Sequence, residues 1–265
     1  EPLSLAATPQ VAHPGRVEGQ GFAGLREYAV GDDPRHIDWK TSAKRAKLIT
    51  REFTIERSQT VITLIDCGRG MTQLAGEFPR FEHALSSAMI LTDIAASAGD
   101  RVGTLVFDDQ IRAFVPAQRS RGALHAVRDA VVPVTASSRE PDYASAFRHL
   151  ASHQRKRALV VLFTDVLGVR ASRALLAHVA RSSQRHLALV VALRNDPLLA
   201  MAAPAAVTSA SQLYANAAAA ELVESREEAL ERMRRAGAIV LDVSPSTMTA
   251  SVINRYLELK ARGAL

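Results

Sequence analysis

The chain has 265 residues, of which 48% are hydrophobic, and a formal net charge of +6. This length suits one α/β domain with an appendage, or two small domains, and the apolar content is enough for a sizeable core. The single cysteine, Cys67, excludes an intramolecular disulfide, and no apolar run approaches the roughly 20 residues that a membrane-spanning helix needs.

The N-terminal part of the chain is unusually polar. Residues 1–20 contain Pro and Gly without periodicity and are predicted to form an arm. Residues 21–52 are crowded with charges and include the only tryptophan, Trp39. Burying an unpaired charge costs several kcal/mol, so these groups must be solvated or paired with one another. Partial alternation of apolar and polar residues over 48–55 indicates a strand.

From residue 59 onward, short apolar runs alternate with segments of helical periodicity. Strands are predicted at residues 61–65, 102–107, 111–115 (an edge strand), 158–163, 187–193 and 238–243. Helices are predicted at residues 81–98, 121–131, 143–150, 172–182 and 211–236, and after Ser244. The alternation predicts an α/β fold with a doubly wound, mostly parallel sheet covered by helices on both faces. Such sheets bind ligands at the carboxyl ends of their strands.

The polar segment matches a long signature at many fixed positions, namely Leu25, Arg26, Tyr28, Gly31, Asp32, Asp33, Arg35, Ile37, Asp38, Trp39, Ser42 and Ala43. In this pattern the chain resembles the bacterial domain-of-unknown-function 58 family, whose signature precedes a von Willebrand factor A-like domain. The resemblance implies an N-terminal arm and signature segment at residues 1–57 and a von Willebrand factor A-like domain, doubly wound and Rossmann-like, at residues 58–265.

The resemblance also raises the question of a metal site. Von Willebrand A-like domains often hold Mg²⁺ or Mn²⁺ with Asp-x-Ser-x-Ser after the first strand, a later Thr and a final Asp, all oxygen ligands. Asp66 and Asp165 stand at the two carboxylate positions. The hydroxyl positions hold Gly68, Gly70 and Pro141 instead. We therefore expect no bound cofactor and a degenerate site.

The predicted rim of this degenerate site consists of Asp66, Gly68, Arg69, Gly70, Asp142 and Asp165. Arg69 offers a positive charge of its own, so Asp66 and Asp165 are expected to pair with it or to cap helices. Asp142 is predicted to cap the helix that follows it. The alternative is a weak Mg²⁺ or Mn²⁺ ion held by Asp66 and Asp165 with water.

The signature itself has two interpretations. Its polar and aromatic residues of interest are Arg26, Tyr28, Gly31, Asp32, Asp33, Arg35, Asp38 and Trp39. As a structural latch, its arginines would pair with its aspartates, residues 31–34 would form a turn, and the Trp39 ring would pack on the α/β core. As an interface, the same ordered loop would present an aromatic anchor to a partner protein. The two interpretations are compatible.

No nucleophile with a neighbouring base, P-loop, dinucleotide fingerprint or zinc spacing is present, and Cys67 is predicted to be a small buried residue. The predicted function is therefore a non-enzymatic interaction module. The resemblance implies partnership with a MoxR-type AAA+ ATPase in chaperone-like work on other proteins. It also implies a location in the cytoplasm or at the cytoplasmic face of the inner membrane, with any membrane association made through a segment that this chain does not contain.

Two alternatives belong to other classes. Basic residues cluster at Arg119–Arg128, Arg148–Arg157 and Arg170–Arg185, which would suit nucleic acid or another anionic surface. No aromatic residues are interleaved with these clusters, so nucleic-acid binding is the weaker interpretation. The other alternative is a metal-dependent hydrolase that would use Asp66 or Asp38.

Overall fold

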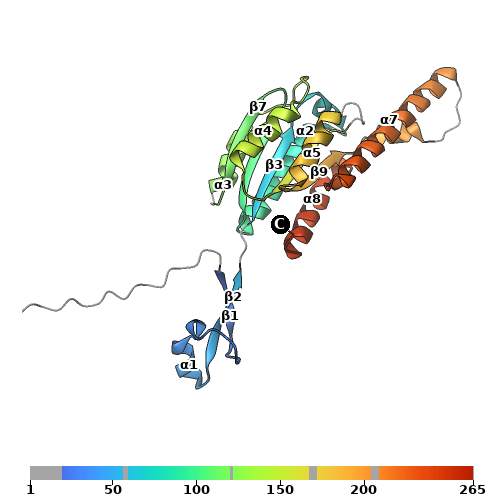
Figure 1. Ribbon diagram of the computed structural model, residues 1–265. Coiled ribbons are helices and arrows are strands. Elements are labelled where there is room, and N and C mark those ends of the chain that lie inside the picture. The colour runs from blue at the N-terminus through green and yellow to red at the C-terminus, as the bar shows by residue number, and fades with distance from the viewer. Residues whose placement is uncertain (1–19, 56–58, 120–121, 167–171, 204–208, 265) are drawn as a thin grey trace, which may run out of the picture. The chain divides into compact units, whose positions relative to one another are not determined.

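The computed structural model describes residues 20–55, 59–119, 122–166, 172–203 and 209–264. The chain divides into two compact units, residues 1–58 and 59–265, and each is described here by itself (Figure 1). The predicted N-terminal arm falls almost wholly outside the described residues.

The first unit consists of two antiparallel strands joined by a segment with two short helices. Strand β1 (Gln20–Glu27) pairs antiparallel with β2 (Ile49–Ile55), which confirms the strand predicted at 48–55. Between them lie a short 3-10 helix, η1 (Pro34–His36), and the helix α1 (Trp39–Arg45). Gly31 adopts a φ of +111°, a conformation that glycine reaches without strain, and this lets the chain turn sharply before η1.

The second unit is built on a six-stranded sheet with the order β10-β9-β8-β3-β6-β7. The strands are β3 (Thr60–Asp66), β6 (Arg101–Phe107), β7 (Ile111–Gln118), β8 (Leu159–Thr164), β9 (Leu187–Leu193) and β10 (Ile239–Val243). All neighbours are parallel except β6 and β7, which pair antiparallel at one edge. After β3 the chain forms β6 and β7 on one side of β3, and then β8, β9 and β10 on the other side. The strand order therefore reverses beside β3.

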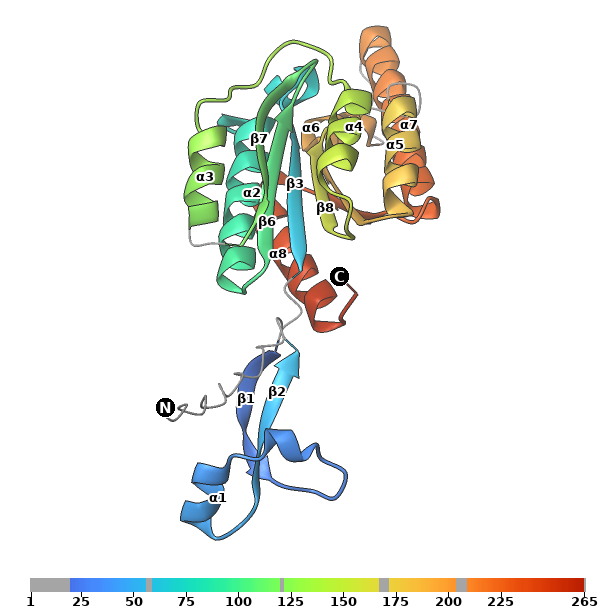
Figure 2. The same ribbon diagram turned by 60° about the vertical axis from the view of Figure 1, so that its left-hand side comes forward.

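Helices cover both faces of the sheet (Figure 2). One face packs against α2 (Arg80–Ser97), α3 (Gly122–Val131) and α8 (Pro245–Ala261). The other packs against α4 (Tyr143–His153), α5 (Arg173–Ser183) and α7 (Ala210–Arg235). Every residue of β8 is buried, which is why its sequence is a continuous apolar run rather than an alternating one. The fold class is the predicted one.

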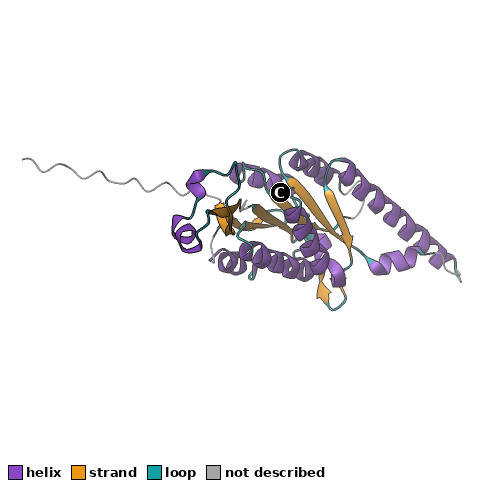
Figure 3. Ribbon diagram, turned by 90° about the horizontal axis from the view of Figure 1, so that it is seen from below, coloured by secondary structure: helices purple, strands orange, loops and turns teal. Residues whose placement is uncertain are grey.

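Three local features differ from the sequence expectations. A helix that was not predicted, α6 (Asp196–Ala202), packs against α7. Figure 3 shows the strands in orange and the helices in purple. The Asn195 side chain caps this helix, accepting a hydrogen bond from the Leu198 N–H at 3.2 Å. Short strands β4 (Leu74–Ala75) and β5 (Phe78–Pro79) form a small hairpin after the 3-10 helix η2 (Arg69–Thr72). Strand β7 also continues beyond the predicted residue 115.

The residues that precede α4 and α8 differ in how they cap their helices. Asp142 is the N-cap of α4, and its carboxylate accepts a hydrogen bond from the Ser145 N–H at 2.9 Å, which confirms the prediction. Ser244 occupies the N-cap position of α8, but its hydroxyl contacts the hydroxyls of Ser246 and Thr247 rather than a backbone N–H. Within the ranges that the structure covers, no helix combines the length and apolar character needed to cross a membrane.

Candidate functional site at the strand ends

The carboxyl ends of β3 and β8 bring together the two predicted carboxylates. Asp66 is the last residue of β3, and Asp165 follows β8 directly. Because β3 and β8 are parallel neighbours, their ends lie at the same edge of the sheet. Tyr143 is the first residue of α4, and its hydroxyl reaches the Asp66 carboxylate at this edge. The predicted convergence of these loops is therefore present.

Asp66 is 2% exposed, and both of its carboxylate oxygens are engaged by protein donors. One oxygen accepts a hydrogen bond from the Gly68 N–H at 2.7 Å. The other accepts from the hydroxyls of Thr164 at 2.7 Å and Tyr143 at 3.1 Å. Burial raises the pKa of Asp66 to about 6, although these three donors oppose the rise because they stabilise the carboxylate.

Asp165 is held by a buried arginine that the sequence analysis did not identify. The Arg80 guanidinium, at the start of α2, contacts the Asp165 carboxylate at 2.7 Å, and both side chains are almost fully buried. Burial raises the pKa of Asp165, and the Arg80 charge opposes that rise. In the sequence, Arg80 stands at the start of an ordinary helix. Nothing near it in the chain predicts that its side chain reaches the end of a distant strand.

The two glycines at the serine positions are enclosed. A Cβ atom on Gly68 would lie 2.8 Å from the Arg139 backbone oxygen and 3.0 Å from Pro141 Cδ. A Cβ atom on Gly70 would lie 3.0 Å from both the Cβ atom and an oxygen of Asp165. Side chains at these positions would clash unless the neighbours moved, so glycine is required by close approach rather than by a turn.

A divalent ion does not fit the residues at this site. The Asp66 oxygens are occupied by three donors, and one oxygen of Asp165 is paired with the fixed positive charge of Arg80. The other Asp165 oxygen, Oδ2, has no hydrogen-bond partner among the described residues, but it belongs to this same guanidinium-paired carboxylate and faces Gly70. The serine hydroxyls that such an ion would use are replaced by glycines whose surroundings leave no room for a side chain. Among the described residues, no group of three His, Cys, Asp or Glu side chains could hold a metal ion. Arg80 supplies the positive charge that a cation would bring.

Arg69 does not pair with Asp66 or Asp165. Of the two expectations for those carboxylates, pairing with Arg69 or capping a helix, the first was therefore wrong. The Arg69 guanidinium lies on the surface and contacts the exposed Glu140 carboxylate at 2.5 Å. Asp142, beside Glu140, is also exposed. The exposed charged residues at this end of the sheet are therefore Arg69 and Asp142 of the predicted rim, together with Glu140. Asp66 and Asp165 are buried.

A third buried carboxylate, Asp108, holds the loop that carries Ser137 and Arg139 in place. It follows β6 and accepts hydrogen bonds from Arg112 at 2.7 Å and from the Ser137 hydroxyl at 2.8 Å. Burial alone would raise the pKa of Asp108, but these donors outweigh it and the pKa is lowered. Arg139 contacts Asp109 at 2.6 Å. The sequence signal for this network was the pair 108–109, two carboxylates that directly follow a predicted strand.

Cys67 lies among these elements but has no exposed thiol. It is fully buried and unpaired, as predicted, and burial raises the pKa of its thiol to about 12. A thiol with so high a pKa is not a nucleophile at neutral pH.

The signature residues of the first unit form the ion pairs that the latch interpretation predicts. Arg26 contacts Asp32 at 2.6 Å, and Arg35 contacts Asp33 at 2.7 Å. The Tyr28 hydroxyl donates a hydrogen bond to the Asp32 backbone oxygen at 3.3 Å. The Asp32 pKa is lowered chiefly by its hydrogen bonds from Arg26. These contacts are largely exposed, so they fix the loop geometry more than they stabilise the fold.

Asp38 connects the signature helix to the ladder. Its carboxylate caps α1 by accepting a hydrogen bond from the Thr41 N–H at 2.9 Å, and it contacts Arg51 of β2 at 2.9 Å. The predicted packing of the adjacent Trp39 ring on the α/β core would join the two units, and it stays a prediction. Within its own unit the Trp39 side chain is 67% exposed, so this unit does not supply the packing that the latch interpretation gave to the ring.

The family model for Protein of unknown function DUF58 matches residues 24–212, a range that begins in the signature and ends in α7. The chain belongs to this family. The match confirms the resemblance inferred from the signature, and it joins the ion-paired loop of the first unit and the strand-end rim of the second in one family pattern.

Curated relatives of this DUF58 protein share only part of its length. A Mycobacterium tuberculosis protein, described as uncharacterized protein Rv1480, is 25% identical over 160 residues, which are 59% of this chain and 50% of that protein. This chain therefore spans about half the length of the curated relative that it matches. A Bacillus subtilis protein, uncharacterized protein YeaD, is 46% identical over 44 residues, which are 17% of this chain and 11% of that protein.

Solved structures are similar to this DUF58 protein in fold. The conserved hypothetical protein BatB from Bacteroides thetaiotaomicron aligns over 77% of this chain and 99% of its own, with a TM-score of 0.51 and 14% identity. The pilus adhesin SpaC from Lactobacillus rhamnosus GG aligns over 76% of this chain and 30% of its own, with a TM-score of 0.52 and 10% identity. At these identities the likeness shows the fold alone, which is von Willebrand factor A-like as predicted.

Proposed function

We propose that this protein is a non-enzymatic interaction module that works as an adaptor or co-chaperone of a MoxR-type AAA+ ATPase in protein assembly or activation. The observation that carries the non-enzymatic part is the buried contact between Arg80 and Asp165. It neutralises the strand-end site from within, where a metal-dependent enzyme would need an open cation site. A site closed in this way is suited to presenting a fixed surface to a partner.

The proposed contact surface on the second unit is the exposed part of the rim. Arg69 and Glu140 are both more than half exposed, and Asp142, two residues after Glu140 in the chain, is exposed as well. The Arg69 N–H donates to the Arg139 backbone oxygen at 2.7 Å, so the two loops that carry this surface are fixed to each other. A rigid pair of opposite charges discriminates between partners because a wrong partner leaves one charge unpaired.

The proposed second contact is the signature face of the first unit. Trp39 is exposed beside the ordered ion pairs, and Val30 and Leu48 are exposed apolar residues of the same unit. Aromatic residues of this kind are frequent energetic anchors at protein interfaces. Arg35 of the same unit, which is also exposed and pairs with Asp33, offers a charged group.

The test is capture from a lysate of the protein's own source, with ATP present and the intact chain as bait. We expect a MoxR-type AAA+ ATPase to be retained by the wild type and lost from Arg69→Glu. Arg232→Glu is the matched control, because Arg232 also pairs on the surface with a glutamate, Glu228, but lies on α7. Trp39→Ala tests the second contact in the same assay.

Two results would contradict parts of the proposal. If no AAA+ ATPase is retained by the wild type, the partnership is wrong. If the ATPase is retained equally by the wild type and by Arg69→Glu, the partnership stands but the rim is not the contact surface.

A further inference from the structure

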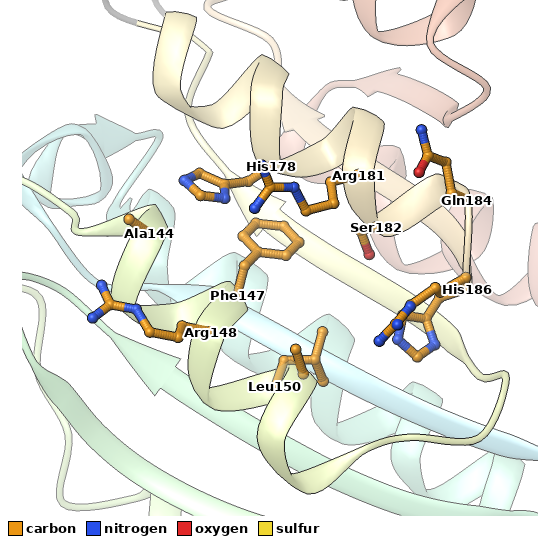
Figure 4. Close-up of a pocket in the computed structure, with 11 residues that line it drawn as sticks. Ala144, Phe147, Arg148, Leu150, His178, Arg181, Ser182, Gln184 and His186 are labelled. Carbon is orange, nitrogen blue, oxygen red and sulfur yellow. The ribbon is translucent and has the colours of Figure 1, made fainter.

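A pocket of about 630 Å³ lies between α4 and α5 on the second unit (Figure 4). Its volume is within the range of known ligand sites, which is about 300–1,000 Å³. Its apolar part is formed by Phe147 and Leu150 of α4, which are buried, and His178 of α5 stacks on the Phe147 ring at 5.7 Å between ring centroids. The pocket can therefore enclose an apolar side chain.

Three arginines surround this apolar part. Arg148 comes from α4, Arg181 from α5 and Arg185 from the turn after α5, and all three are exposed. Within the described parts of the chain, none of the three makes an ion pair with an acidic side chain. Two of the basic clusters seen in the sequence therefore meet around one pocket. Guanidinium groups match the planar geometry of carboxylates, which they bind through paired hydrogen bonds.

Two buried polar groups at the pocket are also unsatisfied. The Ser182 hydroxyl and the His186 Nδ1 atom are buried and have no hydrogen-bond partner among the described residues. Buried polar atoms normally have partners, so two such atoms lining one pocket point to a ligand that supplies them. Burial lowers the pKa of His186, and Arg185 lowers it further, so the neutral ring can donate or accept a hydrogen bond.

We propose that this pocket binds an acidic peptide segment of a partner protein, with a leucine or phenylalanine side chain in its apolar part and carboxylates on Arg148, Arg181 and Arg185. Ser182 and His186 then take hydrogen bonds from the peptide backbone or a carboxylate. This inference rests on the proposed function as an interaction module, and it adds a third surface with a defined ligand chemistry. The three arginines favour acidic residues, and the apolar part of the pocket favours an apolar side chain, so together they select an acidic sequence with apolar residues.

Single-stranded nucleic acid is the less suitable occupant. Proteins that bind single strands without sequence preference stack bases on exposed aromatic rings. Phe147 is the only Phe, Tyr or Trp among the residues that line this pocket, and its ring is buried beneath His178. The pocket therefore lacks the stacking platform that its arginines would need.

The test is fluorescence anisotropy with a fluorescein-labelled peptide containing Glu, Asp, Leu and Phe, titrated with the intact protein. The charge variant is Arg148→Glu/Arg181→Glu. Its matched control is Arg155→Glu/Arg173→Glu, which makes the same change in net charge at exposed arginines outside the pocket. Ala151→Trp fills the pocket without changing the charge. Circular dichroism checks that each variant is folded.

We expect the charge variant and Ala151→Trp each to weaken binding at least about tenfold, and the control to leave it nearly unchanged. Replacing the acidic residues of the peptide with Lys, or Leu and Phe with Ala, is also expected to abolish binding. Equal weakening by the charge variant and its control, no effect of Ala151→Trp, or no binding to the wild type would each overturn the proposal. So would an oligoribonucleotide that competes for the same pocket.

The two proposals fail separately. If the wild type retains the AAA+ ATPase but does not bind the peptide, only the pocket proposal is wrong. If the peptide binds through the pocket but no ATPase is retained from the lysate, only the ATPase partnership is wrong.

Discussion

Arg80 and Asp165 form a buried ion pair, in which the charge of each side chain compensates the charge of the other. Replacing Arg80 with Met leaves the Asp165 carboxylate buried without its counter-charge. Removing one partner of a buried ion pair costs about 3–5 kcal/mol, so we expect the free energy of unfolding of Arg80→Met to fall by about that amount. Urea titration measures it.

The double variant Arg80→Met/Asp165→Leu is the control for this prediction. It removes both charges and leaves none unpaired, so it should recover most of the stability lost in the single variant. A double variant that is as unstable as Arg80→Met would show that the pair contributes through shape or hydrogen bonding rather than through charge.

Asp66 gives stability a defined pH dependence. Its folded-state pKa is raised to about 6, above the unfolded value of about 3.9. Between these two values the folded state binds more protons than the unfolded state, so the Asp66 contribution to stability falls as pH rises from about 4 to about 6. Asp66→Asn, which does not ionise, lacks this contribution.

The measurement compares the unfolding free energies of wild type and Asp66→Asn by urea titration at about pH 4 and about pH 7. The wild type should lose about 1–3 kcal/mol relative to the variant across this interval, at about 1.4 kcal/mol for each pKa unit. Taking the difference between the two proteins cancels the titration of every other group. A difference that stays constant with pH would show that Asp66 ionises normally.

At the scale of elements, the turn after β3 is packed against the loop before α4. The Gly68 Cα carries no side chain because the Arg139 backbone oxygen occupies that space, and Gly70 meets Asp165 in the same way. Restoring serines at both positions should therefore not restore a metal site. We expect Gly68→Ser/Gly70→Ser to lose about 1–3 kcal/mol of stability through overpacking.

Thermal unfolding with and without millimolar Mg²⁺ checks the same element. The melting temperature of the serine variant should fall, and Mg²⁺ should raise it neither in the variant nor in the wild type. Gly24→Ser is the control, because a Cβ atom there meets nothing within 4 Å. A rise with Mg²⁺ that Asp66→Ala abolishes would instead support the weak-ion alternative.

At the scale of the whole molecule, the apolar core lies almost entirely in the second unit. Both clusters of buried apolar residues belong to residues 59–265, whereas the first unit has few buried side chains among those described. We expect residues 59–265 alone to fold and to melt cooperatively within a few degrees of the intact chain. Differential scanning calorimetry measures this, and a molten or much less stable fragment would show that the first unit is required for folding.

The sequence by itself determined the features that depend on local periodicity or on close neighbours in the chain. The parallel strands are continuous apolar runs, so their positions were readable, and strand β9 occupies the predicted residues. The Asp142 cap and the pairing of Arg26 with Asp32 also involve residues only a few positions apart. The family followed from the same local pattern, because the signature is contiguous.

Only the tertiary structure decided which distant groups meet. Asp165 pairs with Arg80 rather than with Arg69, and Arg148 meets Arg181 at a pocket, because helices from separate parts of the chain pack on the same sheet. The partner of a buried charge is selected by long-range packing and desolvation, and neither leaves a periodic trace in the sequence.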